Sequence, residues 1–122
     1  MDRTFAFAGS VSAFIAVAAG AFGAHALKRS LSPENLQAFE TGARYQMYHA
    51  FALFAVAWVA TQSPGLAATW AGRLFIVGTI LFSGSLYLLA LTGVTRLGII
   101  TPFGGLALLA GWVCLAFAVK PS

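Results

Sequence analysis

The sequence predicts an all-helical membrane protein, with four antiparallel transmembrane helices and one short amphipathic helix at the membrane interface. Hydrophobic residues make up 60% of the 122 residues and charged residues only 8%, whereas a soluble domain carries about a quarter charged residues. Four apolar stretches are each long enough to cross about 30 Å of hydrocarbon. Five of the ten charged residues fall in the first gap between these stretches, within residues 28–49.

The first predicted span covers residues about 4–27 and is rich in Ala and Gly. Ala16, Gly20 and Ala24 recur at four-residue spacing, which favours close packing of one helix face against a neighbour. The segment Ala24-His25-Ala26 resembles a signal-peptidase site, but the apolar run before it exceeds the roughly 7–15 residues of a signal peptide. We therefore expect the segment to be retained as a membrane span.

A short amphipathic helix is predicted over residues about 33–42, between the first two spans. Ser32 can cap free N–H groups, Pro33 suits the first helical position, and Glu34 suits the positive end of the helix dipole. Apolar residues recur at helical spacing, which favours a helix lying in the interface plane: Leu36, Phe39 and Ala43. We expect a hinge at Thr41-Gly42 before the second span.

The remaining spans are predicted over residues about 43–61, 71–91 and 102–119, and together the four spans form a single domain, residues 1–122. The last span begins with Thr101-Pro102, a cap followed by proline. Three tryptophans near proposed span ends are expected in an interfacial aromatic belt: Trp58, Trp70 and Trp112. Small residues of the third and fourth spans are expected to serve helix packing: Ser83, Gly84, Ser85, Gly104 and Gly105.

Polar side chains gather around the first gap and form the candidate site. His25 lies near the end of the first span and His49 near the start of the second, so we expect both imidazoles at similar depth below one membrane face. The complete candidate set is His25, Glu40, Arg44, Tyr45, Gln46 and His49. Glu40 and Arg44 have the i,i+4 order that favours an ion pair. Ionisable groups at membrane depth are functional candidates by default.

Several roles are open to this set. A hydrogen-bonded knot would fix the first loop against the bundle, because a buried polar group is costly unless it is paired. His25 and His49 could instead ligate a b-type haem, or the site could bind a quinone or a lipid headgroup. A proton- or cation-coupled transporter is disfavoured, because no Asp or Glu lies within any predicted span. A small-solute channel or transporter is therefore the least favoured role.

Other classes of function are excluded or disfavoured by what the sequence lacks. It contains no nucleophile–base pair, no phosphate-binding glycine loop and no metal-ligand spacing, so we expect neither an enzyme nor a resident metal or cofactor. The single cysteine, Cys114, lies in an apolar stretch and is expected to act as a small hydrophobe. The net charge of +4 is spread over several loops, which suits anionic lipid headgroups rather than nucleic acid.

Four motifs in order resemble the YgdD-type family of small bacterial inner-membrane proteins, which has eukaryotic relatives. These are GAFGAHALK (20–28), TG followed by RYQMYHA (41–50), LFSGSLY (81–87), and GIITPFGG with GW (98–112). The resemblance covers nearly the whole chain and implies a four-span protein of the cell membrane. It carries no known catalytic residues. The matching positions include His25, Tyr45, Gln46, His49, Ser83, Ser85, Tyr87, Thr101 and Pro102.

The sequence thus predicts a multi-pass protein of the bacterial inner membrane without enzymatic activity. Its expected partners are the lipid bilayer and either further copies of itself or a larger membrane complex. We expect an accessory or scaffold role in the cell envelope. Basic residues are nearly balanced between the two sides, with a slight preference for a cytoplasmic first loop, where Lys28, Arg29 and Arg44 lie.

Overall fold

The computed structural model describes residues 1–122, apart from the side chain of Ala24. All regular structure in the described chain is helical. The elements in order are α1 (Arg3–Val17), a π-helix (Ala18–Gly23), α2 (Ala24–Leu27), α3 (Pro33–Gln62), α4 (Leu66–Thr92), a 3-10 helix (Thr95–Ile99) and α5 (Ile100–Ala118).

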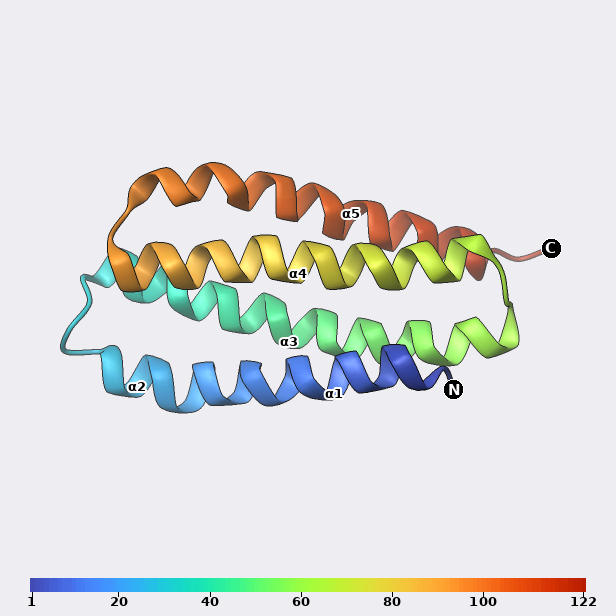
Figure 1. The fold of residues 1–122 in the computed structure, drawn as a ribbon, viewed down its shortest axis with the longest axis horizontal. Coiled ribbons are helices and arrows are strands. Elements are labelled where there is room, and N and C mark those ends of the chain that lie inside the picture. The colour runs from blue at the N-terminus through green and yellow to red at the C-terminus, as the bar shows by residue number, and fades with distance from the viewer.

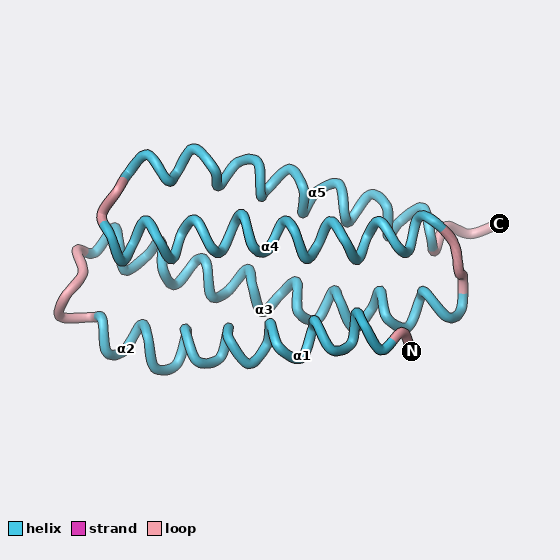
Figure 2. Tube along the Cα trace, viewed as in Figure 1, coloured by secondary structure: helices cyan, strands magenta, loops and turns pink.

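The helices lie side by side in chain order and alternate in direction (Figures 1 and 2). The α1–α2 segment packs on α3, α3 packs on α4, and α4 packs on α5. Both termini lie at one end of the bundle (Figure 1). Short loops at alternate ends connect successive helices, and this connection makes them antiparallel neighbours. Consequently α1 and α5 form the edges of the bundle, and α3 and α4 form its centre.

Local sequence signals set several helix boundaries. The Asp2 side chain accepts a hydrogen bond from the Phe5 backbone N–H over 3.1 Å, and the Ser32 side chain accepts one from Asn35 over 3.2 Å. These bonds satisfy amide groups that have no partner within the first turn. Gly93 ends α4 in the left-handed conformation, at φ 73°, where its N–H bonds back to Leu89. Glycine adopts this conformation without the steric cost other residues bear.

The prediction of a separate interfacial helix over 33–42 is wrong, because one helix runs unbroken from Pro33 to Gln62. Gly42, the expected hinge, packs tightly on α4: a Cβ there would lie 3.0 Å from the Tyr87 ring and 3.3 Å from the Ser83 carbonyl. A single glycine costs a helix only about 1 kcal/mol, and this contact holds the segment straight. Phe39 is buried between Gly23 and Tyr87 rather than facing lipid headgroups.

Three helical stretches of the described residues are long and apolar enough to cross a membrane: Arg3–Leu27, Leu66–Thr92 and Thr95–Ala118. Helix α3 has the length but carries more polar side chains along its first half. Composition alone therefore does not establish α3 as a further membrane span.

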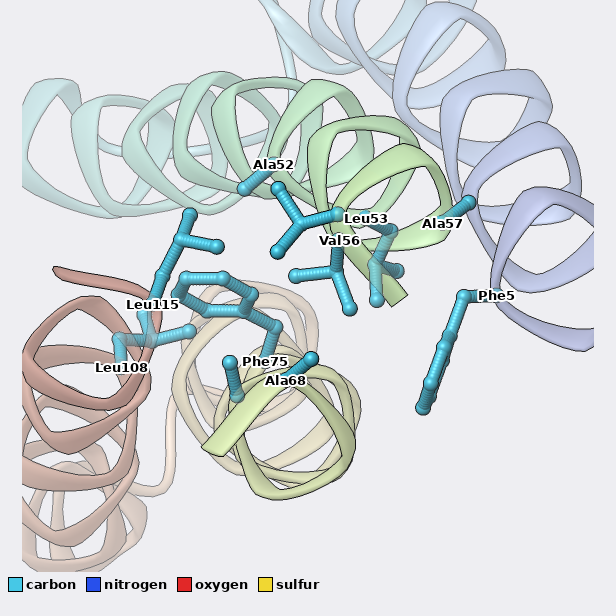
Figure 3. Packing of buried hydrophobic residues seen from close by; sticks show 11 residues of the cluster. Phe5, Ala52, Leu53, Val56, Ala57, Ala68, Phe75, Leu108 and Leu115 are labelled. Atoms are coloured by element: carbon cyan, nitrogen blue, oxygen red, sulfur yellow. The ribbon is translucent and has the colours of Figure 1, made fainter. Parts of the chain in front are cut away.

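The apolar core runs from Phe5 near the start of α1 to Leu115 near the end of α5, so it lies toward the end of the bundle that holds the termini. Figure 3 shows how its side chains pack. Phe75 of α4 is fully buried, between Val56 of α3 and the α5 residues Leu108 and Leu115 (Figure 3). Gly111 makes room for this ring, since a Cβ there would lie 2.8 Å from it. Membrane helices gain stability from such close packing because lipid tails are as apolar as the side chains. The polar interior side chains lie further along the bundle.

Candidate functional site

Gln46 is the centre of a hydrogen-bonded cluster that joins three helices. It is only 6% exposed. Its Nε2 donates to the Ser12 hydroxyl of α1 over 3.3 Å, and its Oε1 accepts from the Tyr87 hydroxyl of α4 over 2.6 Å. The Tyr87 ring in turn packs against Phe39, with ring centroids 5.0 Å apart. This cluster ties α1 and α4 to the same side chain of α3.

His49 is the centre of a second cluster on another face of α3. Its Nδ1 lies 2.8 Å from the Tyr45 carbonyl oxygen, and its Nε2 lies 3.0 Å from Nε1 of Trp112 in α5. An indole N–H can only donate, so Nε2 must be the unprotonated acceptor and Nδ1 must carry the proton. Both ring nitrogens of a neutral imidazole are therefore engaged within the chain.

Aromatic rings enclose the His49 side chain. Measured between ring centroids, the His49 ring lies 5.5 Å from Phe75, 5.8 Å from Trp112 and 6.4 Å from Tyr45. Phe75 and Trp112 also contact each other edge to face at 4.9 Å. Such pairs add about 0.5–1.5 kcal/mol beyond their buried area. The surroundings hold the imidazole in one orientation.

The structure does not bring His25 and His49 together. His25 is exposed in α2, two residues before that helix ends. His49 lies sixteen residues after the start of α3, which is about 24 Å along the helix axis. The expected equal depth is therefore wrong, because α3 begins ten residues earlier than the predicted second span. A haem held between these two histidines is incompatible with this arrangement.

The remaining candidates divide between the surface and the second cluster. Glu40 and Arg44 are exposed and border an open depression of about 310 Å³ with Ala16, Gly20 and Ala43. Neither side chain takes part in the buried hydrogen bonds described above. Tyr45 is 39% exposed, and its ring packs against Phe82 at 4.9 Å between centroids. Of the six candidates, Gln46 and His49 are the two whose side chains are buried.

Serines of α4 bond to backbone and to neighbouring helices. Ser83 donates to the Gly42 carbonyl of α3 over 2.7 Å. Ser85 donates to the Phe82 carbonyl over 2.9 Å and also meets the Thr101 hydroxyl of α5. Hydroxyl groups at membrane depth commonly form such bonds. These hydrogen bonds connect α4 to α3 and to α5.

The residues predicted to serve helix packing have different surroundings. Ala16 is buried and Gly20 would place a Cβ 3.8 Å from Ala43, whereas the Ala24 side chain lies outside the described residues. Gly104 packs directly on the Phe82 backbone. The packing prediction is wrong within this chain for Gly84 and Gly105, because a Cβ at either position meets nothing within 4 Å. These two glycines border grooves instead.

Two grooves lie on different faces of the central helices. The first, of about 450 Å³, lies between α1, α3 and α4 and is bordered by Ser12, Gln46, Thr79, Gly84 and Tyr87 among apolar residues. The second, of about 540 Å³, lies between α3, α4 and α5 and is bordered by Tyr45, His49, Phe82, Gly105 and Trp112. Both volumes fall within the range of small-molecule sites, about 300–1,000 Å³.

Sequence reasoning missed two partners that complete these clusters, Ser12 and Trp112. The prediction that Trp112 belongs to an interfacial belt is wrong. Its indole N–H donates to His49, and the residue lies within α5 rather than at its end. The signal available was its spacing: Leu108, Gly111 and Leu115 share the buried face of that helix. Ser12 had no comparable signal, since its neighbours are small and apolar on both sides.

A helical bundle with apolar outer faces and an internally bonded polar middle defines this chain as a small integral membrane protein. The family model described as "Protein of unknown function (DUF423)" matches residues 19–105. The chain belongs to this family, whose relatives are called UPF0382 membrane proteins and include the YgdD type.

Individual relatives are similar over nearly their whole length. The UPF0382 membrane protein YwdK of Bacillus subtilis is 44% identical over 117 residues, which cover 95% of each chain. The UPF0382 membrane protein SAB0533 of Staphylococcus aureus is 42% identical, covering 95% of this chain and 94% of the relative. The UPF0382 inner membrane protein YgdD of Escherichia coli K12 is 38% identical, covering 87% and 81%. No solved structure matches the chain.

Proposed function

We propose that the chain is a non-enzymatic accessory protein of the bacterial inner membrane, which crosses the bilayer four times and packs with itself or with a larger membrane complex. The observation that supports this proposal is the pairing of the four buried polar residues. Gln46 and His49 are bonded to partners on other helices, and Ser83 and Ser85 are bonded likewise. Polar groups engaged in this way serve the architecture rather than a reaction.

Helix α3 is the fourth span in this proposal. It lies between α1 and α4, both of which have the length and composition of membrane helices. A central helix shares the environment of its two neighbours. Its polar side chains at mid-length, Gln46 and His49, face other helices and are hydrogen-bonded, so they need not meet lipid. The bonds thus offset the lower hydropathy of this helix.

The charged groups support a passive role. Glu34 and Glu40 are exposed near the start of α3, and neither α4 nor α5 contains Asp or Glu. Proton- and cation-coupled transport depends on carboxylates within the membrane. The proposal therefore ranks channel or transport activity below an accessory role.

The edge helices offer the surfaces for partners. The main contacts of α1 are with α3 and those of α5 are with α4. Large side chains project from their outer faces, including Phe14 of α1 and Leu109 of α5, which are 76% and 64% exposed. Lipid can cover these faces, and so can helices of another chain.

Disulfide crosslinking in native membranes tests the proposal. In a Cys114→Ala background, single cysteines replace Phe14 or Leu109 on the outer faces, and a cysteine at buried Ala57 is the matched control. We expect crosslinked species from at least one outer position and none from Ala57→Cys. Native mass spectrometry from mild detergent should show the same assembly. A protein that stays monomeric and uncrosslinked at both outer positions contradicts the proposal.

A further inference from the structure

The groove between α1, α3 and α4 keeps open space at the depth of the hydrogen-bonded cluster. Gly84 borders it, and a Cβ at that position would meet nothing within 4 Å. Glycine inside a helix costs about 1 kcal/mol relative to alanine, and no packing contact of this chain accounts for it here. The space beside Gly84 is therefore available to a molecule that enters sideways from the bilayer.

Three side chains that border this space carry hydroxyl or amide hydrogens without acceptors: Ser12, Gln46 and Thr79. The Thr79 hydroxyl is buried and has no hydrogen-bond partner among the described residues. Ser12 takes part in the described hydrogen bonds only as an acceptor, and Gln46 uses one of its two Nε2 hydrogens. Rotation about χ1 exchanges the hydroxyl and methyl of Thr79, since threonine adopts more than one rotamer in helices. The groove thus has a surplus of donors.

The depth of the groove within the bilayer limits which class of molecule can bind there. Thr79 lies thirteen residues from each end of α4, about 20 Å from either end at 1.5 Å per residue. The hydrocarbon core is about 30 Å thick, so this hydroxyl lies near the bilayer midplane. The carbonyl groups of a phospholipid lie at the interface, some 15 Å away. The acceptor must belong to a molecule that is otherwise apolar.

We propose that this groove binds a lipid-soluble quinone, whose carbonyl oxygens accept hydrogen bonds from Thr79 and from Ser12 or Gln46. A quinone has two carbonyl acceptors and no donor, which complements the surplus of donors. Its apolar tail matches the border formed by Val11, Ile76 and Ile80. The volume of about 450 Å³ suits a ring and the first part of a tail. This site is separate from the His49 cluster and does not depend on the packing role.

Two substitutions test the groove without removing an existing contact. Thr79→Val keeps the shape and removes the unpaired hydroxyl, and we expect about fivefold weaker quinone binding with unchanged unfolding. Gly84→Leu fills the groove, and we expect at least about tenfold weaker binding. Gly105→Leu fills the second groove, where a Cβ likewise meets nothing within 4 Å, and is the matched control with unchanged binding.

The experiment is photolabelling of the full chain in phosphatidylcholine nanodiscs with decylubiquinone carrying a diazirine on its alkyl tail. Labelled peptides are located by mass spectrometry, and affinity is measured by competition with unlabelled decylubiquinone. We expect labels on α1 and α4 beside the groove, and no competition by decylbenzene, which lacks the carbonyls. Equal competition by decylbenzene, labels spread over all outer faces, or equal losses in Gly84→Leu and Gly105→Leu would overturn the proposal.

The result is distinguishable from the test of the packing role. Absence of crosslinks from Phe14→Cys and Leu109→Cys concerns the outer faces of the edge helices, whereas quinone labelling concerns the groove beside Gly84. If Gly84→Leu changes the assembly state but not quinone labelling, a helix of a second copy covers this groove and the quinone proposal is wrong.

Discussion

The indole Nε1 of Trp112 lies 3.0 Å from Nε2 of His49, although 63 residues separate the two in sequence. This bond joins α5 to α3 across the bundle, while Nδ1 of the same ring lies 2.8 Å from the Tyr45 carbonyl. The indole can only donate, so the bond assigns one tautomer to the histidine. Both ring nitrogens of His49 are therefore engaged within the chain.

Trp112→Phe keeps an aromatic ring but removes the donor, leaving Nε2 of His49 without a partner. An unsatisfied buried polar group costs about 1–3 kcal/mol, and we expect the free energy of unfolding to fall by this amount. Denaturation in mixed detergent micelles, followed by circular dichroism, measures it. Trp58→Phe is the control, because Trp58 is exposed and should change stability little. Equal effects of the two substitutions would show that the indole bond contributes nothing.

Gln46 and Tyr87 should be energetically coupled, because the tyrosine hydroxyl donates to Oε1 of Gln46 over 2.6 Å. In a double-mutant cycle with Gln46→Leu and Tyr87→Phe, we expect a coupling free energy of about 0.6 kcal/mol, the average for hydrogen bonds between membrane helices, and at most about 1.7 kcal/mol. The four unfolding free energies of the cycle provide the measurement. Strictly additive effects would mean that the bond does not stabilise the bundle.

Adjacent glycines of α5 should respond oppositely to alanine. At Gly104 a Cβ would collide with the Phe82 backbone, which cannot move aside without separating α4 from α5. We expect Gly104→Ala to lower the free energy of unfolding by about 1–3 kcal/mol. At Gly105 the Cβ meets open space, so Gly105→Ala should be neutral or stabilise by up to about 1 kcal/mol. Thermal unfolding of both variants in one detergent tests this, and the reverse order would contradict the α4–α5 contact.

Added haemin should not bind through the histidines. His49 has both nitrogens engaged, and His25 lies about four helical turns away along the bundle axis. Titrating haemin into the detergent-solubilised chain should therefore give the same absorption spectrum for the wild type, His25→Ala and His49→Phe. A bis-histidine spectrum that disappears in both variants would contradict the described positions of these residues.

The helical class, the membrane character and the family could be predicted from the sequence because apolar length and ordered motifs are local properties. The capped start at Ser32-Pro33 is likewise local and lies where expected. The sequence could not show that the helix continues through Gly42, because what keeps α3 straight is contact with Tyr87 and Ser83 of another helix. Local propensity does not reveal such a contact.

Only the local features of the candidate site could be predicted from the sequence. Gln46 and His49 stand out as polar residues within an apolar stretch, and the structure buries both. Their pairing with Ser12 and Trp112 depends on which helix faces which, and the spacing within one helix does not determine that. The same limit applies to Gly84 and Gly105, which were expected to serve helix packing because they are small, although both border open space.

Nitrogen-15 NMR of the two histidines in nanodiscs tests most directly the claim that the polar interior is bonded to itself. The chain has only His25 and His49, so exposed His25 is an internal reference and His49→Phe assigns the signals. We predict that His49 is neutral, with a proton on Nδ1 and none on Nε2, and that Trp112→Phe shifts the Nε2 resonance. A proton on Nε2 of His49, or a signal unaffected by Trp112→Phe, would contradict this account.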